Sequence, residues 1–390
     1  MVYDIVIVRY GEIGIKSEQV RRKFEHLLME NIRAMLDSRN VKYEDVIRER
    51  GRIFVKTNDP KATDAVSNVF GVVSASPAYM TGPTIEEAAK VAVEIGKKVI
   101  KDNESFAIQA RRSGGQPFTS QEIGKQCGDA VYNAVIEKHP RVDLKHADHD
   151  IHVEIRDSGS YVFTDIVKGV GGMPLGSQGK LIAMVSGGID SPVASWLMMK
   201  RGCEIVPVFF DNDPFFANDS TQKRAIQCLT KLKEWSPGHP MKAYIMPHGS
   251  NLQAFQEKGN VKYTCVFCKH LMYKVSRDLA KKIGAQGIIT GSSIGQVASQ
   301  TSDNMLAEIY DVDFPVYHPL IGLDKEEIVE MSKKLGIFEI SIQKAAGCKA
   351  VPKHPSIRGH LEEVIMWEEK LFNFDDLIKY EMDNIKEVQI

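Results

Sequence analysis

A short segment near the middle of the chain has the residue types of a phosphate-binding loop. Residues 186–191 read Ser-Gly-Gly-Ile-Asp-Ser and follow the apolar run Leu181–Val185, which predicts a strand. Two glycines let the backbone turn sharply, and Ser191 followed by Pro192 predicts an N-cap and the first turn of a helix. A strand, a glycine loop and a helix N-terminus together leave free N–H groups that bind anions. The alternative is that the glycines make only a tight turn.

The same loop argues against two common chemistries. It lacks the Lys-Ser/Thr ending of a Walker A loop, and it lacks the G-x-G-x-x-G pattern of dinucleotide-binding proteins. Kinase-like transfer and hydride transfer are therefore disfavoured.

Three of the six cysteines could hold a metal or carry sulfur. Cys265 and Cys268 have the C-x-x-C spacing of metal ligands, and Cys348 supplies a third thiol. A structural zinc ion would need a fourth ligand, which His270 or His354 could provide. Three thiolates could instead hold a [4Fe–4S] cluster with one iron left open, which would be useful if that iron must hold sulfide. A redox dithiol is the third interpretation.

Arginines in the N-terminal third could contact nucleic acid. Arg111 and Arg112 follow a predicted strand, while Arg48, Arg50 and Arg52 alternate along another segment and so share one face. Side chains placed in this way could grip phosphates or a structured RNA end without reading its sequence. The alternative for each cluster is a solvated charged face.

The elements that must position these residues change in kind along the chain. Residues 181–290 alternate near-continuous apolar strands with helices, which is typical of a parallel sheet covered on both faces. Ligands of such sheets bind at the carboxyl ends of the strands, where the glycine loop is expected. Before them, residues 1–58 predict a small α+β unit and residues 59–166 a second one, with a terminal hairpin at Asp157–Ser160. The glycine-rich stretch Gly169–Gly176 marks a linker.

Length, charge and cysteine content limit the class of protein. A chain of 390 residues is expected to form two or three domains. The formal net charge of -1 excludes a uniformly basic nucleic-acid clamp, so any RNA surface must be local. No apolar run reaches the roughly 18 residues that span a bilayer, and no signal peptide opens the chain, which favours a cytoplasmic protein without a membrane partner. The remaining cysteines, Cys127, Cys203 and Cys228, are expected to be buried, inert thiols.

Taken in order along the chain, the motifs resemble one known family. Ser186–Pro192 is similar to the loop of N-type ATP pyrophosphatases, which adenylate a carbonyl oxygen and release pyrophosphate. Arg9–Lys16, Gly171–Lys180 and Gly291–Thr301 resemble the tRNA 4-thiouridine synthetase family, and the resemblance covers nearly the whole chain. It implies an α/β protein with an N-terminal ferredoxin-like domain (1–58), a THUMP RNA-binding domain (59–166), a linker (167–178) and a parallel-sheet, PP-loop ATP pyrophosphatase domain (179–390).

The resemblance also implies an activity and a set of site residues. The implied reaction is ATP-dependent thiolation of uridine at tRNA position 8, with tRNA as partner, ATP and Mg²⁺ as cofactors, and Asp190 as a catalytic residue. Many bacterial members have Arg where this chain has Lys269, a change that keeps the charge but loses the bidentate fork. Carried over position by position, the ATP contacts are Met184, Val185, Ser186, Gly187, Gly188, Asp190, Ser191, Phe209, Phe210, Lys269, Gly291 and Gln300, and the RNA contacts are Arg50, Arg52, Arg111 and Arg112.

The source of sulfur is less closely defined. Many bacterial members carry a C-terminal rhodanese domain, whereas this chain stops about 40 residues after Cys348, so we expect sulfide or an unidentified sulfur donor. Some family members resemble this arrangement and use an iron–sulfur cluster. That favours a [4Fe–4S] cluster, or a [3Fe–4S] cluster if the open iron is lost, on the catalytic cysteines Cys265, Cys268 and Cys348. Zinc at the three cysteines, persulfide chemistry through Cys348, a homodimer and a side role in thiamine biosynthesis stay open.

Two other functions compete with this one. Another adenylating enzyme, such as an amidotransferase-like ligase or a 2-thiolation enzyme, would not need the long segment before the linker. An RNA-binding module fused to a degenerate nucleotide domain would be a non-enzyme, but the intact Asp190 and Ser191 argue against such decay.

Overall fold

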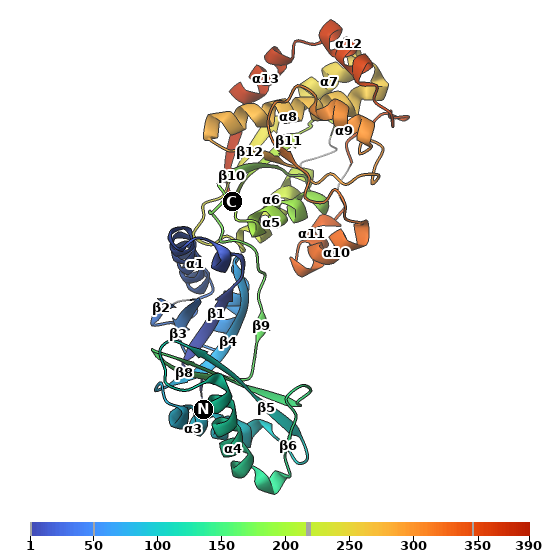
Figure 1. The fold of residues 1–390 in the computed structure, drawn as a ribbon. Coiled ribbons are helices and arrows are strands. Elements are labelled where there is room, and N and C mark those ends of the chain that lie inside the picture. Colours follow the sequence, from blue (N-terminus) through green and yellow to red (C-terminus); the bar gives the residue numbers. More distant parts are fainter. Residues whose placement is uncertain (1, 50, 216–219, 345–346) are drawn as a thin grey trace. The chain divides into compact units, whose positions relative to one another are not determined.

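Residues 2–49, 51–215, 220–344 and 347–390 are described by the computed structural model (Figure 1). The chain divides into two units, Met1–Gly172 and Met173–Ile390, and the division falls within the predicted linker residues. Residues on either side of it are hydrogen-bonded into their own unit. The N–H of Gly169 donates to the carbonyl oxygen of Val73 (2.8 Å), and the N–H of Met173 donates to that of Lys200 (2.9 Å).

One nine-stranded sheet runs through the whole first unit, in the order β2-β3-β1-β4-β8-β7-β5-β6 with β9 beside β4 (Figure 1). Strand β4 pairs with β1 along most of its length and with β8 at its far end. The predicted boundary between residues 58 and 59 therefore lies inside one continuous sheet, and it stays a prediction. The strands are β1 (Ile5–Tyr10), β2 (Asp45–Glu49), β3 (Arg52–Lys56), β4 (Val72–Thr81), β5 (Ser105–Ser113), β6 (Arg141–Val142), β7 (His149–Arg156), β8 (Gly159–Phe163) and β9 (Val167–Lys168).

Helices cover one face of this sheet. Alternate residues of each strand point to opposite faces, so only one set of strand residues packs against the helices. Val6 and Val8 of β1 pack with the apolar residues of α1 and α2, while Ile151 and Val153 of β7 pack with those of α3 and α4. The helices are α1 (Glu18–Ser38), α2 (Ala62–Ser67), α3 (Ile85–Val99) and α4 (Ser120–Ala134), with short 3-10 turns at Glu12–Ile15 and Ile136–Lys138.

The second unit contains a six-stranded sheet in the order β14-β13-β10-β11-β12-β15. All neighbouring pairs are parallel except β12 and β15, which are antiparallel, so the predicted parallel-sheet architecture is confirmed. The strands are β10 (Lys180–Met184), β11 (Glu204–Asp211), β12 (Lys242–Pro247), β13 (Ile288–Ile289), β14 (Val316–Tyr317) and β15 (Lys386–Gln389). The helices are α5 (Asp190–Lys200), α6 (Ser220–Lys233), α7 (Gly249–Lys258), α8 (Thr264–Ile283), α9 (Ser302–Ile309), α10 (Lys325–Lys334), α11 (Phe338–Ser341), α12 (Leu361–Leu371) and α13 (Phe374–Asp383), with a 3-10 turn at Val261–Tyr263.

Helix α8 forms the centre of the second unit. Phe267, Leu271 and Val275 on α8 are fully buried and belong to one large apolar cluster with Phe255 of α7 and Ile378 of α13. The C-terminal elements α12, α13 and β15 were not predicted from the sequence. No helix among the described residues is both long and apolar enough to cross a bilayer.

Candidate active site

The glycine loop lies between β10 and α5, at the carboxyl edge of the parallel sheet. The N–H of Ser186 donates to Oγ of Ser191 (2.8 Å), so Ser191 closes the loop. The N-cap role predicted for Ser191 is therefore wrong: α5 begins at Asp190, with Ile189 at the N-cap position and no side-chain cap. The helix starts earlier because the serine hydroxyl is used inside the loop rather than on the first helical turn.

Two glycines let other segments approach this loop closely. A Cβ on Gly187 would lie 2.6 Å from Nε of Arg224, at the start of α6. A Cβ on Gly291 would lie 2.7 Å from the backbone nitrogen of Ser191. Both predicted ATP-binding glycines therefore sit where no larger residue fits without movement.

Asp190, the predicted catalytic carboxylate, has two partners that the sequence did not predict. Its Oδ1 lies 2.6 Å from Nζ of Lys325, and its Oδ2 accepts from Nε2 of Gln296 at 2.9 Å. Lys325 is the first residue of α10, where a positive charge opposes the helix dipole.

The remaining predicted ATP contacts surround the same edge of the sheet. Met184 and Val185 end β10, and the N–H of Val185 donates to the carbonyl oxygen of Val208 on β11 (2.8 Å). Phe209 and Phe210 follow on β11 and are almost fully buried. Gln300 instead closes its own loop, because its carbonyl oxygen accepts from the N–H of Gly295 (2.9 Å).

The three predicted sulfur-site cysteines lie near one another and are all free thiols. Cys265 and Cys268 are in the first turn of α8, and Nδ2 of Asn212, the residue after β11, lies 3.7 Å from Sγ of Cys348. Burial, with the neighbouring Cys268 and Cys348, raises the pKa of Cys265 to about 12. Burial and Cys268 also raise the pKa of Cys348. A cation beside Cys265 and Cys348 would therefore be needed to favour their thiolate forms.

A fully buried histidine, paired with a buried glutamate, contacts one of these cysteines. His248 precedes α7; its Nδ1 lies 2.7 Å from Oε1 of Glu381 on α13, and its Nε2 lies 3.2 Å from Sγ of Cys268. Nδ2 of Asn251 donates to the same Glu381 oxygen at 2.7 Å. Burial alone would lower the pKa of His248, but Glu381 and Cys268 raise it to about 10. His248 and Glu381 were not predicted from the sequence, since neither lies near the cysteines along the chain.

Lys269 forms an ion pair inside the unit. Its Nζ lies 3.1 Å from Oε1 of Glu308 on α9, and Glu308 is fully buried. Burial raises the pKa of Glu308 to about 7, although Lys269 acts against this rise. Lys269 keeps 24% of its side chain exposed, so it can also face a ligand.

The two histidines considered as zinc ligands lie elsewhere. Nδ1 of His270 lies 3.1 Å from the carbonyl oxygen of Glu308, and its ring stacks on Tyr310 with centroids 4.4 Å apart. Burial and Lys274 lower its pKa to about 4. His354 is exposed. Within the described part of the chain, no three His, Cys, Asp or Glu side chains are grouped to hold a single metal ion.

The predicted RNA-binding arginines differ in their surroundings. Arg111 and Arg112 are exposed near the end of β5, and Nη1 of Arg112 donates to the carbonyl oxygen of Gln116 (2.7 Å). Arg52 is largely buried, with 18% of its side chain exposed, and its Nη2 lies 3.3 Å from Oε2 of Glu154. Arg50 lies outside the described residues.

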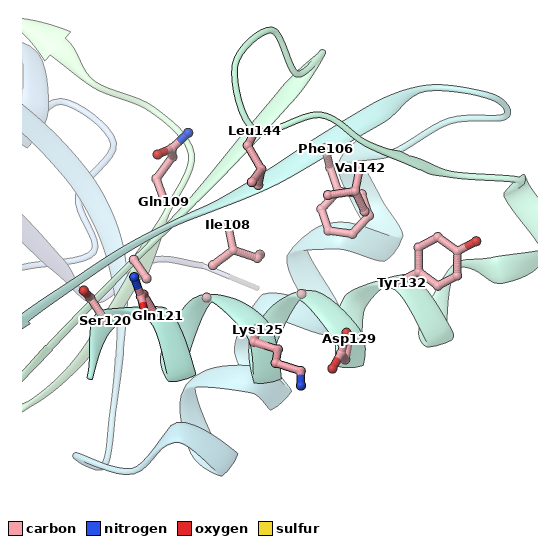
Figure 2. Close-up of a pocket in the computed structure, with 13 residues that line it drawn as sticks. Phe106, Ile108, Gln109, Ser120, Gln121, Lys125, Asp129, Tyr132, Val142 and Leu144 are labelled. Atoms are coloured by element: carbon pink, nitrogen blue, oxygen red, sulfur yellow. The ribbon is translucent and has the colours of Figure 1, made fainter. Parts of the chain in front are cut away.

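A pocket of about 650 Å³ lies between β5 and α4 in the first unit (Figure 2). Phe106 and Ile108 of β5 and Leu144, two residues after β6, give it apolar walls, and Lys125 and Asp129 of α4 add charge. Figure 2 shows α4 running along one side of it and β5 along the other. Aromatic and apolar walls with a few polar groups suit a planar base better than a phosphate.

Comparisons with known proteins agree along the whole chain. The family described as "Thiamine biosynthesis protein (ThiI)" matches residues 176–373, the "ThiI ferredoxin-like domain" matches residues 5–76, and the "THUMP domain" matches residues 83–165. A probable tRNA sulfurtransferase of Methanosarcina acetivorans is 50% identical over 370 residues, covering 94% of this chain and 90% of that protein. One of Thermococcus kodakarensis is 40% identical over 370 residues, covering 93% and 95%.

Solved structures give the same result. A 4-thiouridine synthetase–RNA complex with bound ATP superposes with a TM-score of 0.88 at 31% identity and covers 100% of both chains. PH1313 from Pyrococcus horikoshii superposes with a TM-score of 0.67 at 32% identity, covering 85% of this chain and 99% of that one.

Proposed function

Since the chain belongs to the ThiI family of tRNA sulfurtransferases, we propose that it uses ATP to convert the uridine at position 8 of tRNA into 4-thiouridine. The family expected from the motifs, and the ferredoxin-like, THUMP and parallel-sheet fold expected with it, are confirmed. The roles of Asp190 and of the three cysteines in the reaction are the part that we propose.

The proposal rests on one placement above all. Cys348 contacts Asn212, which lies two residues after Phe210 at the carboxyl end of β11. The glycine loop follows β10, the parallel neighbour of β11. Adenylation and sulfur delivery are therefore served by adjacent strand ends of one sheet, as expected for a reaction in which one base undergoes both steps.

The first step forms an adenylated base. The uridine O4 attacks the α-phosphorus of ATP, the bond between that phosphorus and the bridging oxygen breaks, and pyrophosphate leaves with the electron pair. Backbone N–H groups of residues 187–191 would hold the pyrophosphate, and Asp190 would hold Mg²⁺. Lys325, at 2.6 Å from Asp190, would add a positive charge where negative charge develops.

The second step replaces oxygen with sulfur. Hydrosulfide attacks C4 of the base, the C4–O4 bond breaks, and AMP leaves with the electron pair. Loss of the proton from sulfur then leaves a C4 thiocarbonyl. Sulfide thus enters as a co-reactant, and the balance needs no oxidant or reductant.

We propose an iron–sulfur cluster as the resident group of the cysteines. A single zinc ion needs four donors around one point, but His270 is committed to Glu308 and Tyr310. The three thiols are close enough to act on one another, because Cys268 and Cys348 both help to raise the pKa of Cys265, and each of three such thiolates could contact a different iron of a cluster. When bound by Cys265, Cys268 and Cys348, such a cluster would supply one open iron coordination site for hydrosulfide.

Nucleoside analysis tests the overall reaction. Protein purified without oxygen is incubated with unmodified tRNA, Mg-ATP and sulfide, and the digested tRNA is examined for 4-thiouridine while AMP is measured separately. Asp190→Asn and Lys325→Met should each lower AMP formation by at least about a hundredfold, because they remove charges from the site of phosphate chemistry. Glu326→Gln, an exposed change on the same helix turn, is the matched control. Undiminished AMP formation by both variants would place the ATP site elsewhere.

Charge reversal tests RNA binding by the first unit. The double variant Arg111→Glu/Arg112→Glu should weaken tRNA binding, since phosphate contacts release counterions, and it should leave ATP hydrolysis measured without tRNA unchanged. The matched control reverses two adjacent exposed charges, Lys97 and Lys98 on α3. Equal weakening in both double variants would mean that only net charge matters.

A further inference from the structure

The second face of the nine-stranded sheet carries a small core built from strands alone. Ile5 and Ile7 of β1 meet Phe54 of β3 and Tyr161 and Phe163 of β8, and all five are almost fully buried. The residues of helices α1–α4 belong to the clusters on the other face, and none belongs to this one. Something other than a helix must therefore shield this core from water.

Arginine side chains provide that shield. The guanidinium carbon of Arg9 lies 4.9 Å from the centre of the Phe163 ring, and that of Arg156 lies 5.8 Å from the centre of the Phe54 ring. Nη1 of Arg9 also donates to Oγ of Ser76 at 2.9 Å. A guanidinium over an aromatic face keeps its charge and still covers apolar surface.

Arg52 and Arg111 bring two more positive charges to the same face. Arg9 pairs with Ser74 of β4, and Arg111 is opposite Glu154 in the ladder between β5 and β7. Glu154 is opposite Tyr161 of β8 in turn, which places it on the side of the strand-built core. The face therefore gathers guanidinium groups from four strands, β1, β3, β5 and β7.

The carboxylates on this face do not balance these charges. Glu154 is shared by Arg156 (2.7 Å) and Arg52 (3.3 Å), and Glu49 contacts Arg156 at 3.4 Å. Asp150, farther along β7, accepts from Gln109. Among the described residues, no carboxylate oxygen lies within 4.0 Å of a nitrogen of Arg9 or Arg111.

Two further features indicate that the arginines of this face lack a counter-anion. Nε of Arg52 is buried and has no hydrogen-bond partner among the described residues, which leaves one donor unsatisfied. Burial and the positive charges of Arg52 and Arg111 lower the pKa of Arg9 to about 10, against the attraction of Glu154. The arginines therefore repel one another, and an anion between them would relieve the repulsion.

We propose that this face of the sheet binds one phosphodiester group of the tRNA backbone, shared by Arg9 and Arg111 in front of Arg52. A phosphate offers several oxygens to planar guanidinium groups, and shared arginine contacts to phosphate are charge-assisted hydrogen bonds. The proposal deepens the RNA-binding part of the proposed function. It places the contact on the sheet rather than on a helix.

The dependence of tRNA affinity on salt tests the shared phosphate. Each neutralised phosphate contributes about 0.7 to the slope of log K against log salt on single strands and about 0.9 on B-form DNA, so a change of roughly 0.7–0.9 is expected for one phosphate of tRNA. Arg9→Gln and Arg111→Gln in the full chain should each lower the slope by roughly that amount. Because both side chains contact one group, the double variant should lower the slope by no more than either single variant.

Two further variants separate binding from folding. Arg9→Lys keeps the positive charge and should keep the wild-type slope, even where affinity falls. Arg39→Gln removes a partly buried arginine directly after α1, whose partner is Asp64, and should leave the slope unchanged. All variants are first checked for an unaltered cooperative thermal transition.

Inorganic phosphate distinguishes the source of the anion. If the site prefers the RNA backbone, replacing chloride with phosphate at constant ionic strength should lower the tRNA affinity of the wild-type chain no more than it lowers that of the Arg9→Gln variant. If phosphate instead weakens tRNA binding by the wild-type chain but not by Arg9→Gln, the site binds free phosphate and the proposal is overturned. Additive slope losses in the double variant, or unchanged slopes in all variants, would overturn it as well. The proposed function fails separately, if the wild-type chain does not bind tRNA at all.

Discussion

The Nδ1 atom of His248 lies 2.7 Å from the Oε1 atom of Glu381, and both side chains are fully buried. Because Nε2 of the same imidazole lies 3.2 Å from Sγ of Cys268, this pair links the C-terminal helix α13 to the cysteine site. The last helix of the chain is thus part of the support of the site rather than a peripheral addition.

Removal of the Glu381 carboxylate from this buried pair should lower the free energy of unfolding. Glu381→Ala leaves the buried His248 ring and the Asn251 amide without their acceptor, and we expect the free energy of unfolding to fall by about 3–5 kcal/mol. Glu387→Ala removes the carboxylate of an ion pair with Lys242 in which both side chains are about half exposed, and it should cost less than about 1 kcal/mol. Urea denaturation followed by circular dichroism compares the two. Equal losses would show that the buried pair contributes no more than a surface pair.

The contact between Gly291 and the phosphate loop leads to a steric prediction. A Cβ at position 291 would meet the Ser191 nitrogen at 2.7 Å and the Asp190 carbonyl carbon at 2.9 Å, so Gly291→Ala must displace the loop. We expect ATP-dependent AMP formation to fall at least about tenfold, since misplacement by about 1 Å can cost more than that. Gly322→Ala is the matched control, because a Cβ there meets nothing within 4 Å. Wild-type activity of Gly291→Ala would mean that the two segments do not act together.

The difference between local and distant signals explains what the sequence could predict. The loop at residues 186–191 and the pair Cys265 and Cys268 were recognisable, because their chemistry depends on neighbours along the chain. Lys325 is 135 residues from Asp190, and Glu381 is 133 residues from His248, so only the folded sheet brings them together.

Arg52 shows what a local pattern cannot predict. Its alternation with Arg48 suggested a basic surface, and the sheet also places it beside Glu154 on β7, a partner 102 residues away that the pattern does not reveal. Alternation identifies a face of a strand and not what that face meets. The fold class, in contrast, follows from periodicities repeated over many residues, and it was predicted correctly.

Glu308 gives the second unit a pH-dependent stability. Burial raises its pKa from an ordinary value of 4.5 to about 7, so the folded protein keeps a proton that the unfolded chain has already released between these values. This contribution to stability is fully present below about pH 4.5 and is lost as the pH rises through about 7. Its size is at most about 3 kcal/mol.

Substitution of the carboxyl group isolates this effect. Glu308→Gln has no proton to release, so its free energy of unfolding should decline less than that of the wild-type chain between pH 5 and pH 8. Glu326→Gln, which changes an exposed carboxylate on α10, should follow the wild-type curve. Denaturant unfolding at several pH values measures both, and parallel curves for all three proteins would contradict the assignment.

The three cysteines allow the resident group to be identified. Protein purified without oxygen should be brown and contain iron and acid-labile sulfide. Cys265→Ala, Cys268→Ala and Cys348→Ala should each lose both, because a cluster held by three thiolates has no spare ligand. Each should also lose 4-thiouridine formation yet keep tRNA-dependent pyrophosphate formation, which reports the adenylation step, since Asp190 and its loop do not depend on these thiols.

The matched control and the metal content decide between the alternatives. Cys127→Ala removes a buried thiol in the core of the first unit and should keep iron, sulfide and both activities. Zinc in place of iron would indicate a structural site, and loss of thiolation only in Cys348→Ala would indicate a persulfide on that residue. Iron-free, colourless protein that still makes 4-thiouridine would exclude the cluster, because the sulfur would then reach C4 without it.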